Sequence, residues 1–448
     1  MGDTGVGSST CPFGRPIRDA HFLFAPTYTP LNHGAFGTYP KSVQKRLHEC
    51  QALSEARPDY FVRYQYPPML DKSRAAMAQF LGLPVDEVVF VPNATTAINV
   101  VLSNLRYKKG DVILHLSTVY GAVEKTIQYL CETTEVDDIN VAVQYPIDDG
   151  FLVSLFRAGI QSVKSQGKTV KIAVFDTISS LPGVRVPWER LVEVCKDEGV
   201  LSMVDGAHGV GHIGLDLAKV QPDFFASNCH KWLYVPRGCA VFHVPKRNQH
   251  LIRTSLPTSH GFDPLPREGG QEIVNPLMIA GPSKSNFVML FEFVATLDVS
   301  PYLCIEEALK FRRDVCGGEE GIVTYCERLS NEGGDKIAEI LSTEVMENGE
   351  KSLARCAMTN VRLPLIIGDG PGEIPRKNTL AVAIWMTEIL AKVHDVYLPA
   401  FIHADAFWVR LSGQIYLELE DCIRGARILR DLCERARGGE YLKDQKRE

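Results

Sequence analysis

This sequence lacks the features that mark membrane proteins, nucleic-acid-binding proteins and disulfide-stabilised proteins. No apolar run approaches the roughly 20 residues of a membrane span, and residues 1–14 lack the basic region and apolar core of a secretory signal. The net charge is −6, with no basic run containing interleaved aromatics, so we expect no nucleic-acid partner. The twelve cysteines form no C-x-x-C pair, which predicts reduced thiols in the cytoplasm.

The length and the apolar pattern predict two domains of α/β type. A chain of 448 residues exceeds the usual size of one hydrophobic core. Apolar segments of about five residues alternate with helix-like segments from residue 31 onward, which favours a mainly parallel sheet covered by helices. The strand-like segments are residues 87–91, 111–116, 141–143, 170–175, 200–204 and 238–244, and the main helix-like segments are 40–56, 70–81, 95–105, 122–131, 151–166 and 186–199.

The pattern changes after residue 285, where a smaller α+β domain is expected. We therefore predict an N-terminal arm at residues 1–30, a large domain at 31–285 and a small C-terminal domain at 286–448. Within the small domain the expected helices are residues 286–293, 305–311, 321–330 and 421–437, and the expected strands are 359–363 and 407–411.

An acid and a lysine stand at two positions where a pyridoxal 5'-phosphate (PLP) enzyme needs them. Asp205 follows the apolar segment 200–204, and Lys231 follows the next strand-like segment. In such an enzyme the lysine forms a Schiff base with the cofactor aldehyde, and the acid keeps the pyridine nitrogen protonated. Each residue also has an ordinary interpretation, because Asp205 could cap a turn and Lys231 could be a solvated charge. The apolar and aromatic neighbours of Lys231 argue against the second.

Three further signals are weak when taken singly. Ala94 and Thr95 lie between a strand and a helix, where a phosphate could bind, although an ordinary helix cap is as simple. Tyr120 follows the strand 111–116 and could stack on a flat cofactor or merely pack. Arg410 lies on an aromatic-flanked strand, where its partner could be a substrate carboxylate or a structural acid.

Two motifs compete with the PLP interpretation and fit less well. Residues 209–214 match the glycine pattern of nicotinamide-binding folds, but the acid expected about 20 residues later is missing. His208 and His212 have the spacing of zinc ligands on a helix, and the glycines between them make that helix unfavourable. We therefore expect no metal site.

Taken together, these signals resemble the class V aminotransferase family of fold-type I PLP enzymes over nearly the whole chain from residue 31. Within that family the likeness is to isopenicillin-N-epimerase-like proteins and to fungal hercynylcysteine sulfoxide lyases of ergothioneine biosynthesis. The stretches that carry it include LNHGAFGTYP, ARPDYFVRYQYP, VFVPNATTAIN, SSLPGVRVPW, PDFFASNCHKWLYVPRGCAVFHV and FWVRLSGQIYLEL.

The resemblance implies a role for each candidate residue. Lys231 would bind the cofactor covalently and move the Cα proton, Asp205 would pair with the pyridine nitrogen, and His208 would lie near the phenolic oxygen. Tyr120 would stack on the ring or protonate the leaving group. The phosphate would be surrounded by Ala94, Thr95, Asn228 and His230, and the substrate carboxylate would be held by Asn32, His33 and Arg410.

The resemblance also implies a homodimer with its active site at the subunit interface. Thr296 matches the residue that reaches the phosphate of the neighbouring subunit. The family usually has Gly-Thr there, whereas this chain has Ala295 before Thr296, a departure that bears on the contact.

The expected reaction is a PLP-dependent β-elimination on a small amino-acid substrate, a cysteine S-conjugate or sulfoxide. A sulfur species leaves, and the remaining fragment decays to pyruvate and ammonia. One alternative is other Cα chemistry of fungal secondary metabolism, such as a loline-pathway type of cyclisation, epimerisation or transamination. A second alternative is a non-catalytic binding scaffold, against which the presence of both Lys231 and Asp205 argues.

Overall fold

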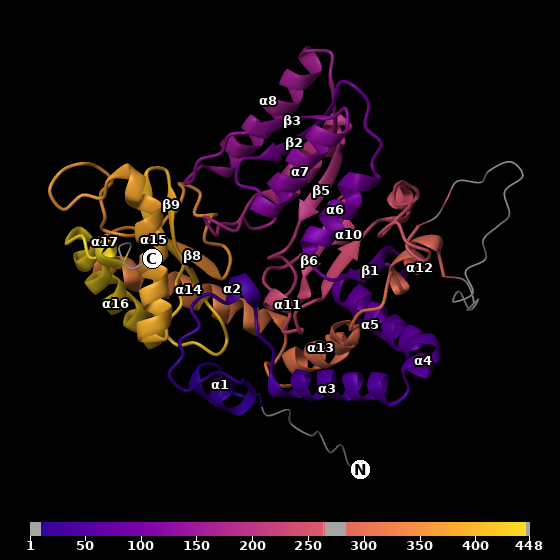
Figure 1. Ribbon diagram of the computed structural model, residues 1–448, viewed down its shortest axis with the longest axis horizontal. Coiled ribbons are helices and arrows are strands. Elements are labelled where there is room, and N and C mark those ends of the chain that lie inside the picture. The colour runs from indigo at the N-terminus through magenta and orange to yellow at the C-terminus, as the bar shows by residue number, and fades with distance from the viewer. Residues whose placement is uncertain (1–9, 263, 265–283, 445–448) are drawn as a thin grey trace, which may run out of the picture.

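A seven-stranded sheet forms the centre of the large domain in the computed structural model, which describes residues 10–262, 264 and 284–444 (Figure 1). Its strand order is β1-β7-β6-β5-β4-β2-β3. β7 is antiparallel to both of its neighbours, and the other strands run parallel to one another. The α/β class with a mainly parallel sheet is therefore confirmed. The strands are β1 (Val88–Val91), β2 (Asp111–Leu116), β3 (Asp137–Val141), β4 (Thr169–Asp176), β5 (Leu201–Asp205), β6 (Phe224–Asn228) and β7 (Ala240–His243).

The strands read as unbroken apolar runs because the sheet is covered on both faces. Every residue of β1, β2, β6 and β7 is buried, as expected when helices cover both faces of a parallel sheet. The edge strand β3 is mostly exposed and therefore has no apolar run. It covers residues 137–141, so it ends where the predicted segment 141–143 begins.

Helices of the large domain pack on this sheet and on one another. α6 packs with α7, and α8 packs with α9. The longer helices are α3 (Lys41–Ala56), α5 (Tyr66–Leu81), α6 (Ala94–Asn104), α7 (Gly121–Thr133), α8 (Asp149–Ser165) and α9 (Trp188–Glu198). The shorter ones are α2 (His33–Phe36), α4 (Pro58–Tyr60), α10 (Leu217–Val220), α11 (Cys229–Trp232), α12 (Asn286–Glu292) and α13 (Ile305–Asp314).

The small domain is built on a three-stranded antiparallel sheet of order β8-β10-β9. Helices α14 and α16 pack on each other, α14 also packs on β8, and α15 packs on β9. Three elements of this domain, α15, β9 and the short α17, are absent from the sequence prediction. The elements are β8 (Met358–Arg362), β9 (Ala400–His403), β10 (Ala406–Ser412), α14 (Glu319–Leu341), α15 (Thr379–His394), α16 (Leu419–Arg437) and α17 (Tyr441–Asp444).

The packing of the two cores divides the chain differently from the predicted boundaries. Phe287 and Ala308 are buried in the core of the large domain, although the small domain was expected to start at residue 286. Ile17, on helix α1 (Arg15–His21), is buried in the core of the small domain. Within the predicted arm, residues 15–21 form a helix that packs on this core, and residues 1–9 lie outside the described residues.

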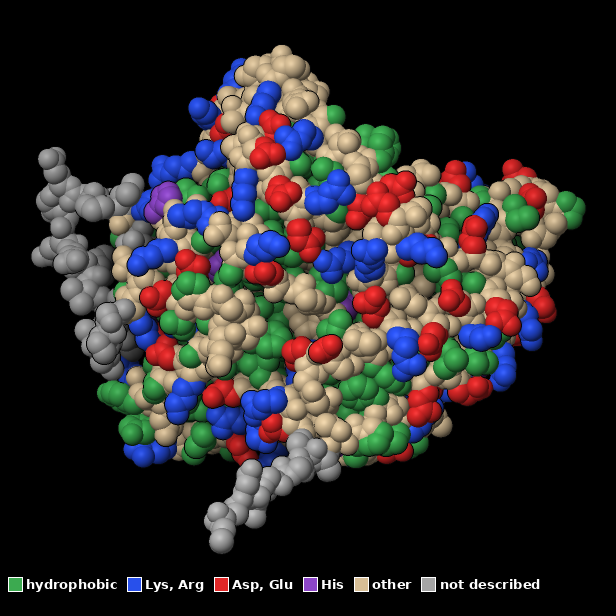
Figure 2. Space-filling model, turned by 180° about the vertical axis from the view of Figure 1, so that it is seen from behind, with side chains coloured by type: hydrophobic (Ala, Val, Ile, Leu, Met, Phe, Trp, Pro, Cys, Tyr) green, Lys and Arg blue, Asp and Glu red, His purple; other side chains and the backbone are tan. Residues whose placement is uncertain are grey.

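The surface carries charges of both signs. Figure 2 shows Lys and Arg side chains intermingled with Asp and Glu side chains over the described part of one face. Such mixing produces no extended field of one sign. Within the described ranges, no helix has both the length and the apolar composition that crossing a bilayer takes.

A glycine holds α2 against the helix that carries Lys231. Gly37 ends α2 with φ +62°, and a Cβ built there would lie 1.8 Å from the carbonyl oxygen of His230. The α2 turn reaches α11 closely because this position has no side chain.

We expect Gly37→Ala to destabilise the protein more than Gly82→Ala. Gly82 also has positive φ but open space around it, so its substitution costs roughly 1–2 kcal/mol of left-handed strain. Gly37→Ala adds an overpacking cost, for a total of roughly 2–5 kcal/mol. Denaturant unfolding of both variants measures the difference, and equal losses would contradict the close approach.

Candidate active site

The carboxyl ends of adjacent parallel strands bring the acid and the amine together. β5 ends at Asp205, β6 ends at Asn228, and Lys231 follows on the one-turn helix α11. Open α/β sheets bind ligands at this edge. Asp205 is buried and Lys231 is partly buried. Burial raises the pKa of Asp205, while a hydrogen bond from the Ala207 N–H (2.9 Å) and the charge of Lys231 oppose the rise.

The amine of Lys231 is tuned toward its neutral form. Burial lowers its pKa to about 8, Asp205 opposes the shift and Arg410 adds to it. A neutral amine is the nucleophilic form of lysine, and a dry, cationic surrounding favours it. Near pH 8 Lys231 can therefore act both as nucleophile and as base.

His208 lies beside this amine. Its Nε2 is 3.1 Å from Nζ of Lys231, and its Nδ1 accepts a hydrogen bond of 3.2 Å from the indole N–H of Trp232. Burial lowers the pKa of His208 well below its usual value, and the charge of Lys231 lowers it further. The imidazole is therefore neutral.

Asp176 is a second buried acid at the same edge, and the sequence analysis did not single it out. It ends β4 directly opposite Asp205 in the strand register. Burial and then the Asp205 carboxylate raise its pKa well above the usual value, and its Oδ2 has no hydrogen-bond partner in the described part of the protein. Burial and the neighbouring carboxylate therefore favour the protonated form of Asp176.

The start of α6 is a capped helix N-terminus, and two of its N–H donors have partners within the protein. Asn93 caps the helix by accepting from the Thr96 N–H at 2.8 Å. The Asn228 side chain accepts from the Ala94 N–H at 2.9 Å, so it ties β6 to α6. Thr95 lies between these two donors. Helix N-termini of this length attract anions.

His230, the fourth residue of the expected phosphate set, lies on α11 beside Lys231. Its Nδ1 is 3.2 Å from the carbonyl oxygen of Cys239. Burial and the nearby Lys231 charge lower its pKa to about 4. His230 is therefore a neutral imidazole whose orientation is set by the backbone of the following strand.

Arg410 is a buried cation that has no acidic partner among the described residues. It lies on β10, and its terminal nitrogens donate to the Ser180 carbonyl oxygen and to Oδ1 of Asn32, both at 2.6 Å. Its Nε is buried without a partner in the described structure, and burial lowers its pKa to about 10. A buried charge needs compensation, so this site favours an anionic ligand.

Arg410 is packed tightly against the loop that follows β4. A Cβ on Gly183 would lie 2.6 Å from Cδ of Arg410. The side chain of Asn360 holds that glycine through both its N–H and its carbonyl, each at 2.9 Å. Residues of both domains therefore fix the orientation of the Arg410 guanidinium.

The geometry gives His33 a different place from the predicted substrate contact. Its Nδ1 is 2.6 Å from the hydroxyl of Tyr416, and its Nε2 is 2.5 Å from the carbonyl oxygen of Lys231. Both ring nitrogens thus have protein partners, and burial lowers the pKa of His33 to about 3. Its contacts are those of a residue that holds α11, while Asn32 next to it contacts Arg410.

The remaining two candidates lie on the surface of the single chain. Tyr120 begins α7, and its side chain is 49% exposed. Thr296 is exposed in the segment after α12. A single chain therefore buries neither residue.

The two competing motifs have other structural explanations. Residues 209–214 form turns and do not open a helix. The Nδ1 of His212 is 2.8 Å from the carbonyl oxygen of His208, and its Nε2 accepts from the Ala357 N–H at 2.8 Å. Both nitrogens of His212 are thereby occupied, and the described residues contain no group of three metal-ligating side chains.

The residues at this edge fit PLP. A low-pKa amine and a buried carboxylate are present for its aldehyde and its pyridine nitrogen, and a helix N-terminus is present for its phosphate. Buried polar atoms nearly always have partners, yet three at this edge have none in the described protein. They are Asp176 Oδ2, Thr177 Oγ1 and Arg410 Nε.

Comparisons with known proteins agree with this assignment. Residues 60–264 match the family model described as Aminotransferase class-V. The chain is 39% identical to the L-cysteine desulfhydrase-like protein lolT1 of Epichloe uncinata, over 96% of this chain and 98% of that protein. It is 30% identical to the hercynylcysteine sulfoxide lyase of Schizosaccharomyces pombe, over 92% and 96%.

A solved structure shares the fold. The cystine C–S lyase C-DES, in complex with cysteine persulfide, superimposes with a TM-score of 0.72 at 17% identity, covering 91% of this chain and 98% of that one.

Covalent capture of PLP by the cofactor-free protein should increase with pH around a midpoint near 8, because the neutral amine of Lys231 reacts. Asp205→Asn should move the midpoint down, since that carboxylate stabilises the ammonium form, and Arg410→Met should move it up. Absorbance of the bound cofactor measures capture at each pH. The exposed Arg376→Met is the control and should leave the midpoint unchanged; shifts of the same sign in both site variants would refute the assignment.

Proposed function

We propose, because this chain belongs to the class V aminotransferase family, that it cleaves the bond between Cβ and sulfur in a cysteine whose sulfur carries a substituent or an oxygen. The protein is a PLP-dependent lyase, and its cofactor is pyridoxal 5'-phosphate. The observation that carries the proposal is the buried Arg410, a cation without an acidic partner among the described residues, which acts on the low-pKa Lys231. A substrate with a carboxylate and an amino group on one carbon matches these two groups.

The residues have distinct roles in this proposal. Lys231 holds the cofactor aldehyde, Asp205 holds the pyridine nitrogen, and the turn at Ala94 and Thr95 with the neighbouring His230 receives the phosphate. When bound, PLP supplies an electron sink for the electron pair left at Cα. Burial raises the pKa of both acids, and the Asp205 carboxylate further raises that of Asp176. In this proposal a proton held by the pair resides on Asp176, which leaves the Asp205 carboxylate for the pyridine nitrogen.

Arg410 and Lys231 together determine which bond to Cα reacts. Arg410 binds the substrate carboxylate through its planar fork, with Asn32 fixing one arm of that fork. Lys231 would hold the cofactor until the substrate binds, and its amine would then accept the Cα proton, for which a pKa of about 8 suits a base near neutral pH. Tyr120 begins α7 at the open side of the site and is proposed to stack on the ring or to protonate the departing sulfur.

The names of the relatives support two substrate classes. Similarity to a sulfoxide lyase supports a cysteine sulfoxide, as in ergothioneine synthesis, and the higher identity to a desulfhydrase-like protein supports cysteine or another conjugate. Other Cα chemistry of fungal secondary metabolism is the competing proposal. It predicts that the carbon skeleton of the substrate stays intact.

The purified enzyme should release pyruvate from at least one of cysteine, an S-alkyl cysteine and a cysteine sulfoxide. Lys231→Ala should abolish turnover, because it removes both the covalent anchor and the base, whereas the exposed Lys219→Ala should match the parent. A coupled pyruvate assay and mass spectrometry of the organic product provide the measurement. Consumption of substrate with an intact carbon skeleton would eliminate the lyase in favour of the alternative.

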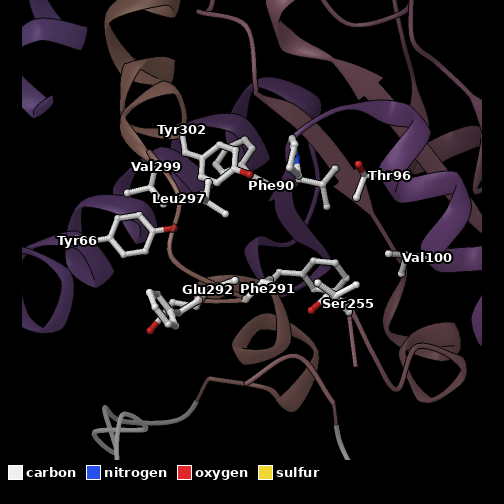
Figure 3. A pocket seen from close by; sticks show the side chains of 16 residues that line it. Tyr66, Phe90, Thr96, Val100, Ser255, Phe291, Glu292, Leu297, Val299 and Tyr302 are labelled. Atoms are coloured by element: carbon white, nitrogen blue, oxygen red, sulfur yellow. The ribbon is translucent and has the colours of Figure 1, made fainter. Parts of the chain in front are cut away.

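A homodimer is the second part of the proposal. An apolar cavity of about 210 Å³ opens beside α6 and α12, and Figure 3 shows the rings of Tyr66, Phe291 and Tyr302 around it. Leu256 and Leu297 line its mouth and are 52% and 45% exposed. Thr296 is exposed beside Leu297, so an apolar contact between two copies here would bring Thr296 to the neighbouring site.

A cytoplasmic location also stays a prediction, which rests on the twelve cysteines without a C-x-x-C pair.

Leu297→Glu should convert the dimer to a monomer and weaken retention of PLP, because it places a charge in the apolar contact. The control Leu380→Glu alters a residue that is 66% exposed on α15 and should leave both properties unchanged. Light scattering after size exclusion gives the molar mass, and the absorbance of the eluted protein gives the bound cofactor. A monomeric parent protein, or a dimeric Leu297→Glu variant, would exclude this interface.

A further inference from the structure

We infer that Trp232 is a positioning residue, which holds His208 in the tautomer that carries its proton on Nε2. His208 then presents a hydrogen-bond donor to the Lys231 side of the site whenever an acceptor faces it. The inference rests on the proposed PLP site. In the loaded enzyme the acceptor for that donor is the phenolic oxygen of the cofactor, which His208 is proposed to approach.

The tautomer of His208 follows from the chemistry of its neighbour. An indole N–H can donate a hydrogen bond and cannot accept one. It lies 3.2 Å from Nδ1 of His208, so Nδ1 must offer its lone pair. The single proton of the neutral ring is then on Nε2, the atom 3.1 Å from Nζ of Lys231. In the cofactor-free protein this contact requires the neutral amine of Lys231 as the acceptor, the form that prevails above its pKa of about 8.

A second histidine holds the indole in place. The backbone N–H of Ala357 donates to Nε2 of His212, so the proton of that ring is on Nδ1 and is donated to the carbonyl oxygen of His208. The His212 ring stacks on Trp232 with centroids 3.6 Å apart and 17° between the planes. His212, which the sequence offered as a metal ligand, instead supports Trp232 and His208 together.

A third histidine contacts the other side of the indole. His33 meets Trp232 edge to face, with centroids 5.0 Å apart. Its Nε2 donates to the carbonyl oxygen of Lys231, and its Nδ1 accepts from the hydroxyl of Tyr416. Trp232 is thus buried between two neutral rings whose own hydrogen bonds are complete, and its indole has little freedom to rotate away from His208.

The arrangement excludes a charged His208. Protonation would require a hydrogen on Nδ1, directly against the indole N–H. Lys231 and Arg410 also face this ring and disfavour a further positive charge, and His33 and His212 act in the same direction. A neutral donor stabilises negative charge on an acceptor oxygen without adding a competing cation, and a hydrogen bond to the charged form of a group lowers its pKa.

The first test uses the PLP-loaded enzyme and Trp232→Phe, which keeps a ring stacked on His212 and removes the N–H. The pH midpoint of the absorption change of the bound cofactor should rise by about one unit, because His208 loses its fixed donor orientation. Trp188→Phe is the matched control, because Trp188 is buried and its indole N–H has no partner in the described structure. That variant should titrate like the parent, and an unshifted midpoint in Trp232→Phe would overturn the inference.

The second test separates positioning from general packing. His208→Leu removes both the donor and the acceptor for the indole, so adding Trp232→Phe to it should produce no further shift. A full additional shift in the double variant would show that Trp232 acts by another route.

The third measurement needs no cofactor and uses a variant only to assign a signal. Nitrogen NMR of ¹⁵N-histidine-labelled protein, with His208→Gln used to assign the signal, should show the Nε2–H form of His208 at about pH 9, where the Lys231 amine is neutral and can accept. The Nδ1–H form or a charged ring would overturn the inference even if the variants do not fold. A parent protein that binds no PLP would instead refute the proposed function and leave this tautomer result independent.

Discussion

The burial of an amine and a carboxylate at one edge of a parallel sheet is the constraint on which the rest of the site depends. Asp205 and Lys231 are each costly to bury alone, and each offsets part of the cost of the other. The neighbouring groups limit the remaining charge, because their surroundings favour a protonated Asp176 and a neutral His208. Arg410, whose hydrogen-bond partners are the neutral oxygens of Ser180 and Asn32, is then a buried cation that an anionic ligand would stabilise.

Much of the large domain could be predicted from the sequence because its strands are buried on both faces. The strand predicted at residues 111–116 has the same bounds as the observed strand β2. Prediction was poorer where burial does not dictate the pattern, as in the exposed edge strand β3. Helix α15 was missed because apolar residues lie on its exposed side as well, among them Leu380 and Ile384, which blurs the helical period.

Helix α14 shows a related limit of sequence reasoning. The prediction ended at residue 330, before Gly333 and Gly334, which disfavour a helix interior. The helix continues to Leu341 because α16 and β8 approach it there, and a Cβ at Gly333 would lie 2.7 Å from Sγ of Cys422. Tertiary packing outweighs the local cost.

Site residues that follow an apolar strand could be recognised from the sequence, whereas those placed only by tertiary contacts could not. Lys231 and Asp205 were recognisable because each follows an apolar strand, and a family motif surrounds the lysine. Asp176 also ends an apolar strand, and that position could have marked it. Nothing in the local pattern of Trp232 indicates its bond to His208, since that contact depends on a turn 24 residues away.

The hydrogen bonds of His33 and His212 join the two domains beside Lys231. Ala357 and Tyr416 belong to the core of the small domain, while His212 and Lys231 belong to the large one. Helices α2 and α11 lie where these two bodies meet (Figure 1). A rotation of the small domain must therefore move both imidazoles with it or break their hydrogen bonds. The boundary between the two domains thus passes directly beside Lys231.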